Sequence, residues 1–342
     1  MSNSSDGGTV WILGAGFSRG LNAPLFRELF LSDKRIAGSG LSLPGATAFP
    51  VMKVYRKYNG NSEDVLWRDP EEFIDVLESA RRPGRALGLL TAATELSVPE
   101  MVDAARRILA IECSHFLRGA DPTTERWQPY LMWGSRLGAS DTVVTFNYDR
   151  VLEVLQEKCR DDCNYYSVIV PADDVASNVR SARDRKCAPI LKLHGSVDWL
   201  ATKERIEIDA GYDLPSRAPS GTDIVLAVPG PDKGELGTRF PQIGILWSEA
   251  LKAVSSARLI VFLGYRFPVT DASARLRFLK AIGAAIVAGT LETIEIVLGP
   301  DGNHPDVARM KGLLSFVCAG TRVTPKVLPL FVEDFLPFSQ GT

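Results

Sequence analysis

The sequence predicts an α/β protein built around a mainly parallel β-sheet. Short runs of β-branched and apolar residues alternate along the chain with segments whose apolar residues recur at helical spacing. Several of these runs end in glycine or in a small polar cluster that leads directly into the next helix. The chain has 342 residues, more than one core usually holds, so we expect one large α/β domain with an insertion, or two domains.

The first strand and turn are expected at residues 9–18. Residues 9–13 are apolar enough for a buried strand, and Gly14-Ala15-Gly16-Phe17-Ser18 follows directly. Glycines after a strand let backbone N–H groups approach a phosphate closely, although a lone GxG is a weak signal. The dinucleotide-binding pattern GxGxxG would need glycine where Arg19 stands. The Gly- and Pro-rich stretch 35–50 is expected to be a loop, where a dehydrogenase would place its second strand.

A largely helical section is expected next. A short helix is predicted near Pro24, and Asp69-Pro70-Glu71-Glu72 and Ser97-Val98-Pro99-Glu100 both carry the signals of a helix start. Residues 125–137 are typical of a helix with an aromatic face. We therefore divide the chain into a core, an insertion and a tail that packs on the core: 9–34 with 139–320, the mainly helical 35–138, and 321–342.

The second strand is expected at residues 142–145, and the polar turn Asn147-Tyr148-Asp149 follows it before a helix over 150–158. In an open parallel sheet, ligands bind just beyond the carboxyl ends of the strands, so Asn147 and Asp149 are candidate functional residues. Asn and Asp also make turns and cap helices routinely, and for this motif taken alone that structural role is the more frequent one.

Two further strands are expected to end in similar turns. An apolar strand over 189–194 ends at His194, and Gly195 allows a sharp exit; a loop is expected before it, over 172–188. Histidine titrates near neutrality, which suits general acid–base work, and a histidine bonded to backbone in a turn is about equally frequent. The strand over 258–263 leads through Gly264-Tyr265 into a helix that Thr270 or Asp271 would cap.

Composition excludes several classes of protein. With 39 basic and 41 acidic residues the chain has no global field to attract nucleic acid. Five cysteines without a CxxC, and a polar N-terminus without an apolar signal region, indicate a reducing cytoplasm without disulfides. No apolar segment reaches the roughly 20 residues that span a bilayer. We expect a cytoplasmic protein that binds neither membranes nor nucleic acid directly.

Several of these motifs together resemble those of a known family. Gly-Ala-Gly-Phe-Ser, then Ala-Pro-Leu-Phe-Arg at 23–27, Thr-Phe-Asn-Tyr-Asp at 145–149 and Leu-His-Gly-Ser at 193–196 are similar to sirtuin motifs in the same order. The longer forms Lys-Leu-His-Gly-Ser-Val-Asp-Trp and Leu-Gly-Tyr-x-Phe-x-x-x-Asp resemble still more the SIR2-like proteins of bacterial antiphage defence. The resemblance runs from residue 9 to about 300 and implies a Rossmann-like, SIR2/DHS-like NAD-binding fold with a helical insertion and no zinc ribbon.

The resemblance also implies roles for single residues. Asn147 and Asp149 would hold the ribose or the nicotinamide, and His194 would be the general base. The expected NAD-binding positions are Gly14, Ala15, Gly16 and Ser18 at the phosphates, Phe26 and Arg27 near the nicotinamide ribose, and Phe146, Gly264 and Tyr265 around the cofactor.

Two departures from the sirtuin pattern argue against protein deacylation. Phe146 stands where sirtuins have glutamine, and Cys159, Cys163 and Cys187 cannot supply the paired CxxC spacing of the zinc ribbon, so no metal is expected. The defence relatives share both losses and hydrolyse NAD. The resemblance therefore implies an NAD⁺ glycohydrolase that depletes NAD in abortive infection; the alternatives are a deacylase or ADP-ribosyltransferase, and a non-catalytic NAD- or ADP-ribose-binding subunit. Control is expected from homo-oligomerisation or a separate partner, such as a ring ATPase or an Argonaute-type protein.

Overall fold

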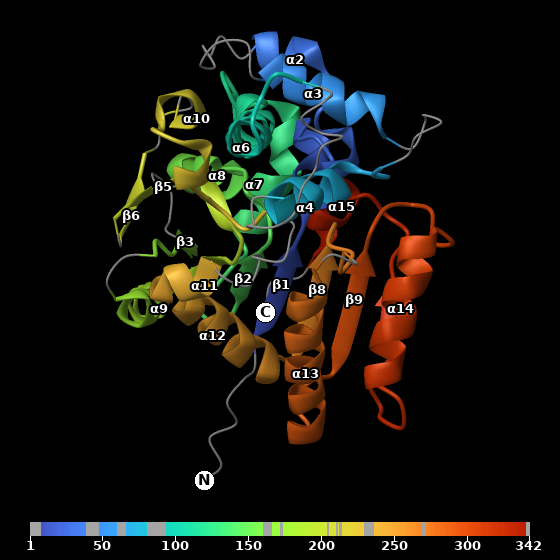
Figure 1. The fold of residues 1–342 in the computed structure, drawn as a ribbon. Coiled ribbons are helices and arrows are strands. Elements are labelled where there is room, and N and C mark those ends of the chain that lie inside the picture. The colour runs from blue at the N-terminus through green and yellow to red at the C-terminus, as the bar shows by residue number, and fades with distance from the viewer. Residues whose placement is uncertain are drawn as a thin grey trace.

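The chain forms a seven-stranded parallel sheet with helices on both faces (Figure 1). The computed structural model describes residues 8–38, 48–59, 66–80, 94–159, 166–171, 174–203, 205–209, 211, 214–228, 236–268 and 271–339. The strand order is β10-β9-β8-β1-β2-β4-β3, and every pair is parallel. The strands are β1 (Thr9–Leu13), β2 (Thr142–Thr145), β3 (Tyr166–Val168), β4 (Ala188–Lys192), β8 (Leu259–Leu263), β9 (Thr293–Val297) and β10 (Pro325–Val327). This confirms the predicted α/β class with a Rossmann-like parallel sheet.

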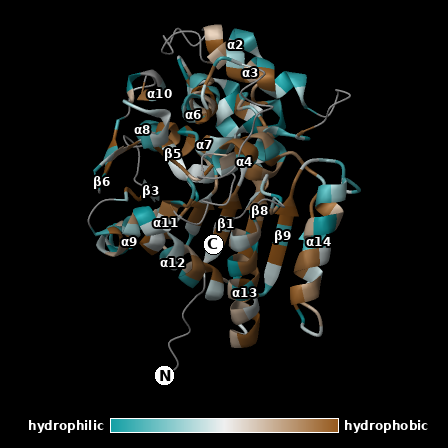
Figure 2. Cartoon of the chain, viewed as in Figure 1, coloured by the Kyte–Doolittle hydropathy of each residue, from teal (hydrophilic) through white to brown (hydrophobic). Residues whose placement is uncertain are grey.

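Both faces of the sheet are buried because successive side chains of a strand point to opposite sides. In β1, Val10 and Ile12 join one apolar cluster while Trp11 and Leu13 join another. Figure 2 accordingly shows β1, β8 and β9 as largely hydrophobic strands. The helices of the first face are α9 (Val175–Asp184), α12 (Pro241–Ser255), α13 (Ala272–Ala288) and α14 (Pro305–Val317). Those of the second are α7 (Gln128–Gly134), α8 (Val151–Cys159) and α15 (Val332–Phe335).

A third cluster lies beyond the carboxyl ends of the strands, around helix α6 (Val98–His115). It joins α2 (Asp33–Gly38), α3 (Ala48–Lys57) and α4 (Pro70–Ala80) to an antiparallel sheet of order β6-β5-β7. The strands of that sheet are β5 (Gly195–Thr202), β6 (Arg205–Ile208) and β7 (Ile224–Leu226). The buried guanidinium of Arg107 donates to the carbonyl oxygens of Pro215 and Ala218, which ties α6 to the segment before β7.

The remaining described elements are short. They are α1 (Ala15–Ser18), η1 (Arg19–Leu21), η2 (Phe26–Glu28), η3 (Glu125–Trp127), α10 (Leu214–Arg217), η4 (Gly221–Asp223), α11 (Leu236–Arg239) and η6 (Leu336–Phe338). Within the described ranges, the search for a helix long and apolar enough to cross a membrane finds none.

Two loops expected from the sequence are helical instead. The stretch 172–188 contains α9, whose N-cap Asp174 accepts a hydrogen bond from the Ser177 N–H and whose Val175, Val179 and Ala182 are buried. Only these three apolar residues form its buried face and polar residues surround them, so the composition of this stretch resembles that of a loop. The stretch 35–50 likewise includes the end of α2 and the start of α3, while 39–47 and Cys163 lie outside the described residues.

The predicted insertion 35–138 packs in two places. Its α2, α3, α4 and most of α6 form the third cluster, whereas Leu117, Trp127, Tyr130, Trp133 and Leu137 pack with β1 and β2 against the second face of the sheet. In the tail predicted at 321–342, β10 pairs with β9 and α15 packs against the same second face.

The order of the strands reverses beside β1. From β1 the chain continues to β2 on one side, and it returns to pair β8 with the other side of β1 before adding β9 and β10. Ligands of open α/β sheets bind at such a switch point, beyond the carboxyl ends of the strands. The turns after β1, β2, β4 and β8 all reach this edge.

Candidate active site

The glycine turns after β1 and β8 are packed directly against each other. A Cβ on Gly16 would lie 2.7 Å from the Cα of Gly264, and a Cβ on Gly264, whose φ is +66°, would lie 2.4 Å from the Cα of Gly16. The N–H groups of Gly14 and Gly16 donate to the carbonyl oxygens of Leu263 (3.0 Å) and Gly264 (3.2 Å). Close backbone packing therefore accounts for these glycines, and two amides that the sequence suggested for phosphate binding are used within the fold.

The turn after β2 separates its side chains between two cores. Phe146 packs into the cluster on the first face of the sheet, and Tyr148 packs into the third cluster around α6. The backbone is held on both sides, because the Phe146 N–H donates to Leu13 O and the Val197 N–H donates to Tyr148 O, each at 3.0 Å. Asn147 lies between the two aromatic anchors, and its side chain turns towards the first glycine turn.

The amide group of Asn147 has a defined orientation. Its Nδ2 donates to the carbonyl oxygen of Gly14 at 3.0 Å and to Oγ of Ser18 at 3.2 Å. An amide nitrogen has two hydrogens, so both are engaged by these bonds. Oδ1 is therefore the atom with which Asn147 can bind a ligand, as an acceptor for a hydroxyl group or water. Ser18, which the sequence suggested for the phosphates, here orients the asparagine.

Asp149 fulfils the structural role left open by the sequence, at the start of α8. Its Oδ1 accepts a hydrogen bond from the Val151 N–H at 3.0 Å. Burial raises the pKa of this carboxyl, while the Lys192 ammonium, the Val151 N–H and the Ser18 hydroxyl act in the opposite direction. The Ser18 hydroxyl thus donates to Asp149 and accepts from Asn147. A direct contact of Asp149 with nicotinamide stays a prediction.

His194 follows β4 and lies against a carboxylate from α13. Its Nε2 is 3.3 Å from Oδ2 of Asp271, and the Tyr265 hydroxyl donates to the same Oδ2 at 3.2 Å. All three residues are buried. Burial, and next the Asp271 carboxylate, hold the pKa of Tyr265 well above its usual range, so its hydroxyl keeps its proton.

Aromatic rings enclose the His194 imidazole. The Phe146 ring meets it edge to face with 4.8 Å between centroids, and Tyr265 stacks on Phe146 at 4.1 Å with 5° between the planes. Trp247 of α12 has its ring centroid 6.3 Å from His194 and donates through Nε1 to the carbonyl oxygen of Leu193. His194 is 5% exposed and Asn147 is 9% exposed, so both are recessed.

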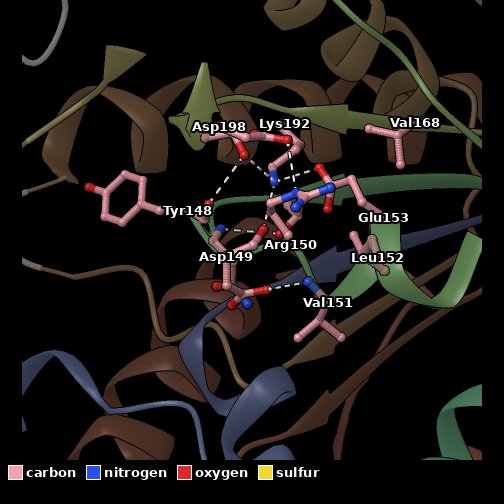
Figure 3. A network of polar contacts seen from close by, with 12 residues as sticks. Tyr148, Asp149, Arg150, Val151, Leu152, Glu153, Val168, Lys192 and Asp198 are labelled. Atoms are coloured by element: carbon pink, nitrogen blue, oxygen red, sulfur yellow. Dashed lines mark hydrogen bonds and ion pairs between the residues drawn. The ribbon is translucent and has the colours of Figure 1, made fainter. Parts of the chain in front are cut away.

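A buried network of charged side chains holds the turn after β2 (Figure 3). The Lys192 ammonium donates to the backbone carbonyl of Asp149 (2.6 Å), to Oε1 of Glu153 (2.8 Å) and to Oγ of Ser196 (2.7 Å). Arg150 pairs with Asp198 at 3.0 Å. Asp149 and Ser196 lie two residues after Asn147 and His194, so Lys192 links the two candidate turns.

Two predicted residues lie apart from these contacts. Phe26 and Arg27 are on η2, where Phe26 packs against the third cluster and Arg27 is exposed. A cavity of about 410 Å³ opens near Asn22, Arg126 and Trp127, and none of the predicted site residues lines it. In the described part of the chain, no three His, Cys, Asp or Glu side chains come together as they would around a metal ion.

Asp271, Trp247 and Lys192 are site residues that sequence reasoning missed. Asp271 is predicted only as a helix cap, nothing in the sequence singles out Trp247, and Lys192 is a single charge in an apolar strand. The one available signal was the spacing from Tyr265 to Asp271 in the Leu-Gly-Tyr-x-Phe-x-x-x-Asp motif.

No protein-family model matches the chain, and no curated protein matches it in sequence.

Proposed function

We propose that the chain is an NAD⁺ glycohydrolase with a SIR2-like fold, which cleaves the bond between nicotinamide and ribose. The observation that carries the proposal is the convergence of Asn147 and His194 at the switch point of a parallel sheet, next to the glycine turn after β1. The motifs that resemble those of sirtuin-related defence proteins, in the same order along the chain, support the same function. In that setting the activity would deplete NAD during abortive infection.

The chemistry requires little beyond orientation and a base. Cleavage of the nicotinamide–ribose bond passes through a transition state resembling an oxocarbenium ion. The bonding electron pair leaves with nicotinamide, which becomes neutral, and a water oxygen bonds to the ribose C1′. Asn147 Oδ1 accepts from a ribose hydroxyl or from this water, and His194 accepts the proton. Such general-base assistance typically contributes about 10²–10⁴-fold to the rate.

The aromatic residues suit a planar ring. Phe146 and Tyr265 stack at 4.1 Å, a geometry that a flat heteroaromatic ring reproduces. Phe146 also fills the position of the sirtuin glutamine and makes a T-shaped contact with His194. These contacts favour water over an acylated lysine as the second substrate. A deacylase would instead consume NAD only when an acetylated peptide is present.

The recessed site favours control by a trigger. His194, Asn147 and Tyr265 are each at most 9% exposed, so we propose that a partner or self-assembly opens the site during infection. Homo-oligomerisation, a ring ATPase or an Argonaute-type protein would serve this role. The expected result is a protein whose NAD cleavage increases when the trigger is added.

Product analysis tests the proposal. Purified protein is incubated with NAD⁺, alone and with lysate of phage-infected bacteria, and nicotinamide, ADP-ribose and cyclic ADP-ribose are separated. The wild type should release nicotinamide and ADP-ribose in equal amounts, while Asn147→Ala and His194→Ala lose about 10²–10⁴-fold. The matched controls are Asn178→Ala on the exposed side of α9 and His304→Asn, which keeps a capping acceptor for α14. Equal rates in the wild type and His194→Ala would refute the assignment.

A further inference from the structure

Asp271 occupies the N-cap of α13 without capping it. An aspartate at this position usually accepts a hydrogen bond from an N–H group of the first turn. Asp271 makes no side-chain capping bond, and its Oδ2 instead faces Nε2 of His194 at 3.3 Å. The N-terminus of α13, a helix from Ala272 to Ala288, favours a negative charge there whether or not the capping bond forms. The carboxylate is thus directed towards the imidazole rather than towards its own helix.

The Tyr265 hydroxyl donates to the same Asp271 oxygen that faces His194. Tyr265 is fixed by its stack on Phe146 and donates to Oδ2 of Asp271. Because that oxygen already serves as an acceptor, its contact with Nε2 of His194 is favourable only when the nitrogen carries a hydrogen. Two donors from different elements then converge on one carboxylate oxygen.

The imidazole is also held against rotation. The edge-to-face contact with Phe146 restricts the plane of the ring, and the backbone that carries it is fixed because the carbonyl oxygen of His194 accepts from the Ala227 N–H at 2.9 Å. We propose that Asp271 is a positioning residue that fixes His194 in the tautomer protonated at Nε2, so that Nδ1 is the atom that accepts a proton. Tyr265 holds the carboxylate in place for this purpose.

The consequence for catalysis rests on the proposed NAD hydrolysis. When the O–H bond of the attacking water breaks, its oxygen bonds to C1′ of the ribose and its proton goes to Nδ1 of His194. The imidazolium that results lies against the Asp271 carboxylate, which stabilises it as the aspartate of a Ser-His-Asp triad does. Without Asp271 the ring would populate both neutral tautomers, and only a fraction of the molecules would present a basic Nδ1.

Nitrogen NMR tests the tautomer without any substrate. The chain has three histidines, His115, His194 and His304, so protein labelled with ¹⁵N-histidine gives few imidazole signals. The His194 signals are assigned by their loss in His194→Gln. At a pH above the titration of the ring, wild-type His194 should carry its hydrogen on Nε2. A hydrogen on Nδ1 in the wild type would overturn the proposal.

Variants test the cause. Asp271→Ala should shift His194 to a mixture of tautomers. Tyr265→Phe removes the hydroxyl but leaves Asp271 next to Nε2, so the hydrogen should stay on Nε2. Asp174→Ala, which removes a true capping carboxylate from α9, should leave the His194 signals unchanged. If Asp271→Ala retains the wild-type tautomer, the proposal is wrong. Asp271→Leu, which has no acceptor and a similar size, replaces the alanine variant if the latter does not fold, with the same criterion.

Kinetics separate this inference from the proposed function. With NAD⁺ as substrate, Asp271→Ala should lower kcat by about tenfold or more and change KM little, because the residue orients the base and does not touch substrate. Wild-type protein that carries the Nε2 hydrogen but cleaves no NAD would discard the proposed function alone. Cleavage at equal kcat by the wild type and Asp271→Ala would discard the inference alone.

Discussion

Replacing Lys192 with methionine should destabilise the fold by about 3–5 kcal/mol, the usual cost of removing one partner from a buried ion pair. Lys192 is 1% exposed and its ammonium makes three hydrogen bonds of 2.6–2.8 Å. Methionine fills similar volume, so the loss is electrostatic rather than a cavity. It would leave the Glu153 carboxylate, whose Oε2 already has no hydrogen-bond partner among the described residues, buried without its cation.

A charge-balanced double variant isolates this effect. Lys192→Met with Glu153→Gln removes both charges, so we expect it to be more stable than Lys192→Met alone by about 0.5–3 kcal/mol. Burial raises the pKa of Glu153, and the Lys192 ammonium opposes this, so loss of the cation should make the carboxyl take up a proton at higher pH. Urea unfolding followed by circular dichroism measures the free energies. A single variant within about 1 kcal/mol of the wild type, or a double variant less stable than the single one, would refute the reasoning.

Three further predictions concern the glycine turn, the asparagine and the pH dependence. Gly264→Ala should lower the free energy of unfolding by at least about 1–2 kcal/mol, because the φ of +66° is left-handed and the new Cβ would meet the Cα of Gly16 at 2.4 Å. Gly312→Ala, in open space on α14, should raise it by about 0.5–1 kcal/mol. Similar shifts of the melting temperature in the two variants would contradict this. Ser18→Ala should reduce kcat for NAD by about tenfold by freeing the Asn147 amide, and an unchanged kcat would count against that role. Asp149→Asn should gain stability relative to the wild type as pH rises above about 4, and parallel pH–stability curves would exclude this.

The pH dependence of Asp149→Asn follows from the direction in which folding shifts the pKa of Asp149. Burial raises the pKa of Asp149 in the folded chain, so folding takes up a proton between the unfolded and folded pKa values. The stability this contributes is fully present below the unfolded pKa and is lost as pH rises through the folded one. Asparagine has no such titration, and its Oδ1 can still accept the Val151 N–H bond, which is 3.0 Å long in the wild type.

Local features of the fold were predictable from sequence because they depend on neighbouring residues. The Ser97–Glu100 capping box starts α6, and Gly289 ends α13 in the left-handed conformation. The turn at Asn147 follows a strand and precedes a helix, as its residues indicate. These signals also locate the strand ends. Because the carboxyl ends of parallel strands lie at the same edge of a sheet, they predict that the turns lie close together.

Contacts between distant elements were not predictable from one sequence. Asp271 looks like any helix cap until α13 is placed beside β4, where its carboxylate meets His194. The glycines after β1 have the same signature whether they receive a phosphate or the backbone of Gly264, and the structure shows the latter contact. Lys192 in an apolar strand gave no sign that its ammonium links two turns.

The most direct test of the central claim is NAD⁺ cleavage in water enriched in heavy oxygen, with infected-cell lysate added as the source of a trigger. We predict that the wild type releases nicotinamide, that one heavy oxygen enters ADP-ribose at C1′, and that His194→Ala under the same conditions falls to the background of the lysate. Heavy-oxygen ADP-ribose formed equally by the wild type and His194→Ala, or by neither above background, would contradict it.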